Sequence, residues 1–172
     1  MGEKKMFENL DLGLERDVFL RTLVRELSGV LQEVVGLDEA AGFISTVGQR
    51  IGTAMNNDYK NKLEVNNLNK DQVTRALVDL KERIKGDFYV IEETEDKVIF
   101  GNNKCPFEDK VVGRPSLCMM TSNVFGTIAS QNMGYAKVSL DETIAQGDKG
   151  CRVTVYFNEN NDSDGREYFK EE

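Results

Sequence analysis

The chain has 172 residues, of which 40% are hydrophobic and 30% charged, a balance typical of a globular protein. Its 30 acidic residues outnumber its 22 basic ones, and at a formal net charge of -8 direct binding to nucleic acid or to an anionic membrane is not expected. No apolar run is long enough to span a membrane, and the first residues lack the apolar core of a signal peptide. We therefore expect a cytoplasmic protein with one domain over residues 15–157, an N-terminal tail over 1–14 and a polar C-terminal tail over 158–172.

The chain has no histidine and three cysteines, which restricts its chemistry. Without histidine, Ser-His and Cys-His nucleophile pairs and histidine-rich metal sites cannot form. Three cysteines are an odd number at low density, which argues against a disulfide framework. Thiol, metal or redox chemistry of cysteine is left open.

Apolar periodicity predicts three helices in the first half of the chain. Apolar residues recur every three or four positions from Glu15 to Val35, and again from Asp38, the expected N-cap, to about Leu63. The second helix contains Gly42, Gly48 and Gly52, which suggests close approach of another helix or of a ligand. Asn69 and Gln72 have the spacing of a capping box and begin a third helix that ends near Gly86.

The second half alternates between strands and helix. Residues 87–101 read as a β-hairpin, and Pro115 opens a helix that runs to about Asn132. Two further strands, in 135–144 and 151–157, form a second hairpin around Gly147 and Asp148. The order predicts an α+β fold in which an antiparallel sheet is covered by helices on one face.

Cys105, Cys118 and Cys151 all lie at the ends of predicted elements, where loops could gather them. Cys118 falls in the first turn of a helix, where the dipole favours a thiolate. Three thiolates and a fourth ligand would suit zinc or an iron-sulfur cluster. The alternative is that all three are buried structural cysteines, because the chain has no CxxC pair.

The segment from Cys118 through "VFGTIASQNMGYAKVSLDETIAQGDKGC" resembles the 4-vinyl reductase domain, a small-molecule-binding module related in fold to subunits of the transport protein particle. Zinc-binding members use a cysteine near the helix start, a Glu-x-x-Cys and a hairpin cysteine. The resemblance carries Cys118 and Cys151 onto the first and last of these. Leu140 and Thr143 stand where the glutamate and the middle cysteine would be, so a zinc site would need Cys105 from the neighbouring loop.

Three segments, "GFISTVGQRIG", "CPFEDKVVGRPSLCMMTSNVFGTIASQNMGYAKV" and "GDKGCRVTVYF", together resemble the methanogen output domain, a module attached to signalling proteins. The resemblance covers roughly residues 15–157. It implies a signalling role and no established chemistry.

These patterns lead to a functional hypothesis of a cytoplasmic sensory or regulatory domain that binds a small ligand in an apolar pocket beside the cysteines. The expected pocket residues are Met119, Met120, Phe125, Ile128 and Tyr135. Uncovered apolar faces on the first helices suggest a homodimer, and the family suggests a signalling partner protein. The alternatives are a metal-free redox switch, in which Cys105 and Cys118 form a reversible disulfide, and an enzyme acting on a cofactor or a tetrapyrrole-like substrate.

Overall fold

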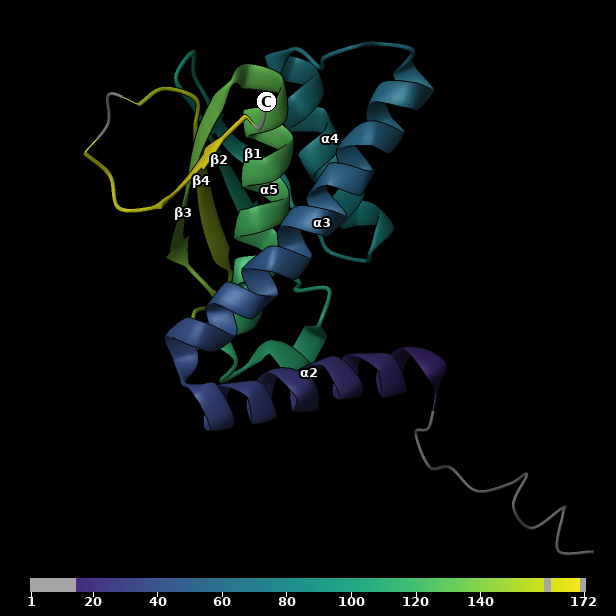
Figure 1. Cartoon of the computed structure of the whole chain (residues 1–172), viewed down its shortest axis with the longest axis vertical. Helices are drawn as coiled ribbons and strands as arrows, with labels where there is room; N and C mark the ends of the chain where they lie inside the picture. Colours follow the sequence, from purple (N-terminus) through teal and green to yellow (C-terminus); the bar gives the residue numbers. More distant parts are fainter. Residues whose placement is uncertain (1–14, 160–161, 171–172) are drawn as a thin grey trace, which may run out of the picture.

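The computed structural model describes residues 15–159 and 162–170, which form a layer of helices on one side of a five-stranded sheet (Figure 1). The helices are α2 (Arg16–Val35), α3 (Leu37–Leu63), α4 (Lys70–Arg83) and α5 (Cys118–Met133), with 3-10 turns η1 (Glu108–Val111), η2 (Pro115–Leu117) and η3 (Ile144–Gln146). The strands are β1 (Tyr89–Glu93), β2 (Lys97–Asn102), β3 (Tyr135–Glu142), β4 (Cys151–Tyr156) and β5 (Arg166–Phe169). The sheet is antiparallel with the order β1-β2-β4-β3-β5, which confirms the predicted α+β class.

Local signals fix most of the helix ends. The Asn69 side chain accepts a hydrogen bond from the Gln72 backbone N-H, and the Gln72 side chain accepts one from the Asn69 N-H, so the expected capping box is present. The expected N-cap at Asp38 is wrong by two residues. Gly36, with φ of 88°, both ends α2 and precedes α3, because only glycine takes that backbone conformation without steric cost.

α5 lies between α3 and the sheet, and it is the central element of the core. Two of the three glycines of α3 allow this close packing. A Cβ on Gly48 would lie 2.8 Å from the Asn123 Cβ, and one on Gly52 would lie 3.0 Å from the Thr127 Cβ. Gly42 has no neighbour within 4 Å. The glycines at 48 and 52 therefore serve helix packing, which was one of the two interpretations of the sequence.

The segment 158–172 is more than the polar tail that we expected. Residues 166–169 form β5, which pairs with β3 from Tyr135 to Val138. The Tyr168 ring packs over Gly126 of α5, where a Cβ would come within 2.1 Å of it, and its hydroxyl lies 2.8 Å from the Ser122 hydroxyl. The sequence did not predict this strand, because four residues are too few for a recognisable pattern and the residues around them are polar.

α2 is oriented with polar residues toward the rest of the protein and apolar residues outward. Arg21 pairs with Glu108 at 2.7 Å, and Arg25 donates to the carbonyls of Lys110 and Val112 at 2.7 and 2.8 Å. Ser28 and Gly29 are its buried residues. The outward face is apolar and exposed, and it contains Phe19, Leu20, Leu23, Val24, Leu27, Val30 and Val34. None of the described helices is both long and apolar enough to cross a membrane.

Candidate functional site

A cavity of about 70 Å³ lies where α4, α5 and the turn η3 meet the start of β4. Its wall includes residues of two apolar clusters. One is the main core around Phe100 and Phe125, and the other is a smaller cluster around Ile44 and Leu117. The polar and sulfur-bearing groups of its wall are Lys81, Asn102, Cys105, Cys118, Thr121, Thr143 and Cys151.

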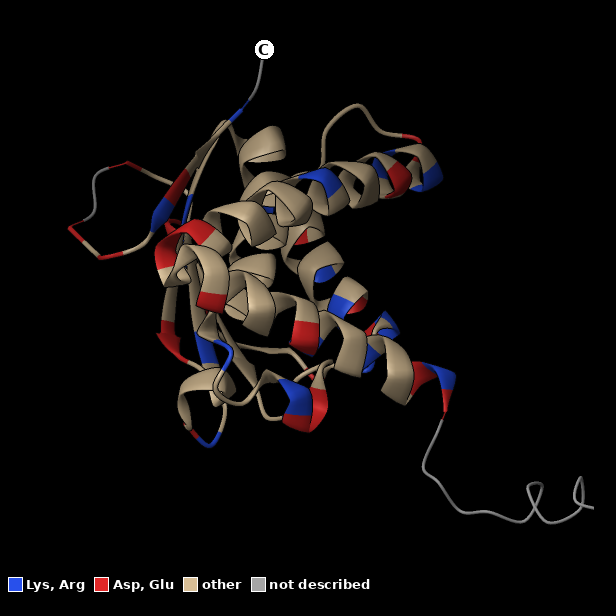
Figure 2. Ribbon diagram, turned by 60° about the horizontal axis from the view of Figure 1, so that its bottom comes forward, with Lys and Arg blue, Asp and Glu red and all other residues tan. Residues whose placement is uncertain are grey.

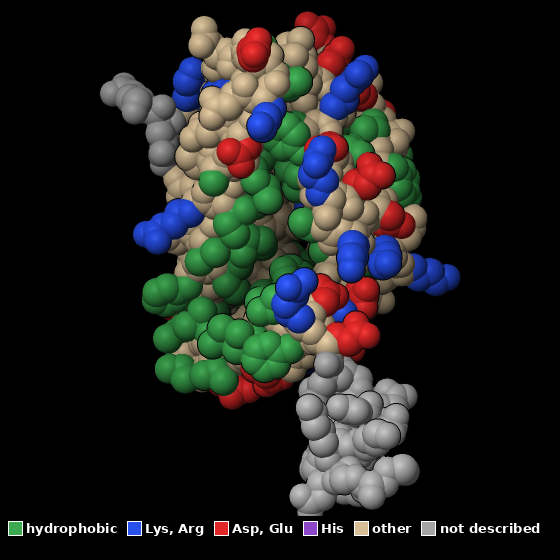
Figure 3. All heavy atoms as spheres, turned by 90° about the vertical axis from the view of Figure 1, so that its right-hand side faces the viewer, with side chains coloured by type: hydrophobic (Ala, Val, Ile, Leu, Met, Phe, Trp, Pro, Cys, Tyr) green, Lys and Arg blue, Asp and Glu red, His purple; other side chains and the backbone are tan. Residues whose placement is uncertain are grey.

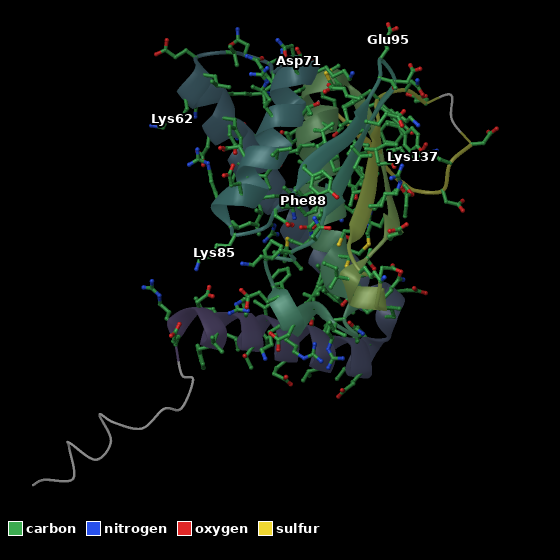
Figure 4. All side chains as sticks on the ribbon, turned by 180° about the vertical axis from the view of Figure 1, so that it is seen from behind. Lys62, Asp71, Lys85, Phe88, Glu95 and Lys137 are labelled. Atoms are coloured by element: carbon green, nitrogen blue, oxygen red, sulfur yellow. The ribbon has the colours of Figure 1, made fainter. Side chains whose placement is uncertain are left out.

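Lys81 contributes a buried ammonium group to this wall. It follows Leu77 by one helical turn and therefore lies on the apolar face of α4. Its Nζ donates to the Thr121 hydroxyl at 2.7 Å and lies 4.9 Å from the Phe88 ring centroid. Phe88, labelled in Figure 4, comes from the segment between α4 and β1. Burial lowers the pKa of Lys81 to about 8, and the three cysteines oppose that change.

The structure brings all three cysteines to this cavity, and each is a free thiol. The expected thiolate at Cys118 is wrong, however. Burial raises the pKa of Cys118 to about 12, and it also raises that of Cys105. The 3-10 turn that precedes α5 places Cys118 inside the smaller apolar cluster, where desolvation outweighs the helix dipole.

A metal site finds no support in the arrangement of these side chains. Among residues 15–159 and 162–170, no group of three or more cysteine, aspartate or glutamate side chains is placed to hold a metal ion. Zinc and an iron-sulfur cluster stay predictions, as does the Cys105-Cys118 disulfide.

Thr143 supplies a polar group without a hydrogen-bond partner. The residue is 4% exposed, and its hydroxyl oxygen makes no hydrogen bond within the described part of the chain. It lies near the Cys118 thiol and slightly opposes the rise in that pKa, but without the geometry of a hydrogen bond. A buried hydroxyl without a partner is unfavourable by about 1–3 kcal/mol, so the site has unused capacity to bind a polar group.

The five residues expected to line a ligand pocket are divided among three places. Met120 lines the cavity, and Met119 packs in the smaller cluster beside it. Phe125 and Ile128 are fully buried core residues. Tyr135 lies at the opposite end of α5, where its hydroxyl donates to Glu167 at 2.8 Å.

Sequence reasoning missed Lys81, Thr121 and Thr143. For Lys81 a signal exists, because a lysine one turn after Leu77 interrupts the apolar face of a predicted helix. Thr143 stands where the middle cysteine of the zinc-binding pattern would be, which marked the position but not its role, and for Thr121 the sequence offers no signal.

A larger hollow, of about 930 Å³, is an open groove between α3 and α4. Its apolar wall includes Met55, Leu63 and Ile84, and Lys62, Arg75 and Arg83 contribute basic groups. Figure 3 shows a hollow on this side of the molecule, next to the hydrophobic side chains that gather on the surface. The groove contains none of the cysteines and none of the buried polar atoms that lack partners.

The ribbon in Figure 2 shows basic and acidic residues interspersed along the chain, with no continuous basic stretch in that view.

Two solved structures show the same fold. The first is the phenol-responsive sensory domain of the transcription activator PoxR with phenol, at 16% identity and a TM-score of 0.63, covering 83% of this chain and 75% of that one. The second is a trafficking protein particle complex subunit 3 from Naegleria fowleri, covalently bound to palmitic acid. It has 10% identity and a TM-score of 0.60, and the match covers 90% of this chain and 98% of that one.

At these identities the likeness establishes the fold and nothing more. The search among curated proteins gives no match. The sequence model of methanogen output domain 1 matches residues 23–156, which is most of the chain and includes α4, α5 and the cavity wall. The chain therefore belongs to the methanogen output domain 1 family.

Proposed function

We propose that this domain is a sensory or regulatory domain that binds a small molecule in the cavity beside Lys81. The observation that carries the proposal is a small cavity whose wall includes both a buried ammonium group and an unpaired hydroxyl. Such convergence of a few polar groups in an apolar cavity is typical of ligand sites. Family membership and the fold shared with a phenol-binding sensory domain support a sensory role.

The cavity is a better candidate than the open groove between α3 and α4. The groove is large enough for a ligand, but three of its polar side chains, those of Tyr59, Asp79 and Arg83, already pair with each other. Asp79 accepts a hydrogen bond from each of the other two. A ligand in the cavity would instead satisfy groups that are buried and underused, which supplies binding free energy without disrupting existing bonds.

Titration of the isotope-labelled protein with small compounds, phenol among them, tests this function by amide chemical shifts. We expect saturable shifts at Lys81, Cys118, Thr143 and Cys151. Ala145→Leu should abolish them, because Ala145 lines the cavity and the larger side chain would fill it. Ala54→Leu adds the same volume at an exposed position of α3 and should leave binding intact. Shifts confined to the groove, or binding unaffected by Ala145→Leu, would contradict the proposal.

We also propose that two copies of the chain associate through the outward face of α2. On this helix the polar side chains already bind the domain, so the exposed apolar residues have no partner within the described chain. Phe43, Val47 and Ile51 of α3 add further exposed apolar side chains. A two-fold contact between copies would cover both patches at once, whereas the net charge of -8 disfavours an anionic membrane as the occupant.

A further inference from the structure

Lys81 is a buried cation without a counter-charge. It is 5% exposed, and none of the ion pairs among the described residues includes it. One hydrogen bond to Thr121 uses one of its three N-H donors, and the Phe88 and Phe125 rings, 4.9 and 5.3 Å from Nζ, provide only weak attraction. Burying a charge in this way is unfavourable unless a partner supplies the opposite charge.

The titratable groups that face Lys81 include no carboxylate among the described residues. They are the thiols of Cys105, Cys118 and Cys151. Burial raises the pKa of Cys105 and Cys118, so both are neutral thiols at physiological pH. The Cys151 sulfur accepts a hydrogen bond from the neutral amide of Asn102 at 3.6 Å.

The Thr143 hydroxyl offers a second donor to the same space. It enters the cavity from the segment that leads into η3, whereas Lys81 enters from α4. A ligand with two acceptor atoms could therefore bind both groups at once. The apolar remainder of the wall, which includes Met120, Leu140 and Val153, suits a short hydrocarbon part.

The volume limits the size of this ligand. A dry protein cavity of about 150 Å³ holds one benzene molecule. The cavity here, at about 70 Å³, has about half that volume. In proportion it holds about three non-hydrogen atoms, half of the six in benzene, and a fourth requires that the flexible Met120 side chain moves.

We propose that the cavity binds a short carboxylate, with one oxygen accepting from Lys81 Nζ and the other from the Thr143 hydroxyl. This inference rests on the proposed ligand-binding function and specifies its ligand class. The charge, the two donors and the size together favour a small anion over a neutral aromatic compound.

Acetate and acetamide provide a direct test, because they have nearly the same shape and differ in charge. Amide shifts of the full chain are followed during titration with each compound at constant ionic strength. We expect acetate to bind at least about tenfold more tightly than acetamide, since hydrogen bonds to charged groups are worth about 1.5–3 kcal/mol. Benzoate, which exceeds the cavity, should bind more weakly than acetate.

Two variants test whether the Lys81 charge and the Thr143 hydroxyl contribute to acetate binding. Lys81→Met should reduce the acetate affinity to that of acetamide, and Thr143→Val should reduce it by about threefold to tenfold. Lys149→Met removes one positive charge at an exposed position near η3 and should change the affinity by less than about twofold, because exposed charges are screened.

The possible results distinguish a failure of the carboxylate assignment from a failure of the proposed ligand-binding function. Equal binding of acetate and acetamide, tighter binding of benzoate, or acetate binding that survives Lys81→Met would overturn the carboxylate assignment, while a ligand in the cavity would still support the sensory function. The absence of any saturable shift, with these compounds and with phenol, would overturn both. The comparison in the unmodified protein decides the assignment even if Lys81→Met does not fold.

Discussion

The buried ammonium group of Lys81 also predicts how the free energy of unfolding depends on pH, whether or not a ligand is bound. Its pKa is about 8 in the folded protein and about 10.5 in the unfolded chain. Between these values the unfolded chain holds a proton that the folded protein has lost, so the free energy of unfolding rises with pH in this window. Below about pH 8 both states are protonated, and the burial penalty is present in full. The whole rise is on the order of 3 kcal/mol.

Urea unfolding at several pH values, followed by circular dichroism, measures this effect. We expect the difference in stability between the unmodified protein and Lys81→Met to grow in favour of the unmodified protein from pH 8 to pH 10. Cys105 and Cys118, whose pKa values are raised by burial, act in the opposite direction in both proteins. Lys149→Met controls for the loss of one lysine, and parallel curves for Lys81→Met would refute a depressed pKa.

Single residues also show why the site was only partly predictable. The positions of the cysteines at element ends correctly suggested that they converge, because loops at one end of a sheet lie close together. Their ionisation was predicted wrongly, since the helix dipole can be read from Pro115 and Cys118 whereas burial in the cluster around Leu117 cannot. The sequence marked Thr143 only as a departure from the zinc-binding pattern, and its place in the cavity wall depends on tertiary packing.

At the scale of elements, the packing of α3 on α5 depends on two glycines and not on the third. We predict that Gly48→Ala and Gly52→Ala each lower the free energy of unfolding by about 1–3 kcal/mol, because the added methyl group forces the helices apart. Gly42→Ala should instead raise it by about 0.5–1 kcal/mol, since alanine favours helix and meets no neighbour. Urea unfolding of the three variants measures this contrast, and a uniform response would contradict it.

The attachment of β5 to α5 predicts an interaction between Gly126 and Tyr168. Gly126→Ala should destabilise the protein by at least about 1–3 kcal/mol, because the methyl group occupies the position of the Tyr168 ring. In a Tyr168→Ala background the same change should have little effect. The four proteins form a double-mutant cycle in urea unfolding. Additive effects would mean that the two side chains do not compete for the same space.

Most elements could be predicted from the sequence because each carries its own signal. α4 has an apolar face and a capping box, β2 has the apolar run Val98–Phe100, and β4 has alternating apolar residues. β5 has no such signal, since its position depends on pairing with β3 and on the space left by Gly126. The orientation of α2 could not be predicted either. Apolar periodicity identifies the apolar face of a helix but does not tell whether that face packs on the domain or is exposed.

For the whole molecule, the proposed homodimer predicts a solution mass of twice the 19.4 kDa of one chain. Leu27, which is 62% exposed on the outward face of α2, is a suitable position to test it. Leu27→Glu should give a monomer in light scattering coupled to size exclusion, because it would bury an unpaired charge in each half of the contact. Ile91→Glu, an exposed apolar residue on the edge strand β1, should leave the mass unchanged. A monomeric unmodified protein would refute the dimer.

The polar attachment of α2 has a consequence for the order in which the molecule opens. The contacts of Arg21 with Glu108 are partly exposed to solvent, so dissolved ions weaken them, whereas the apolar contacts of α5 with the sheet are not screened. The protein therefore contains two levels of local stability. Rising ionic strength loosens α2 first, and its amide hydrogens exchange with solvent while those of α5 stay protected.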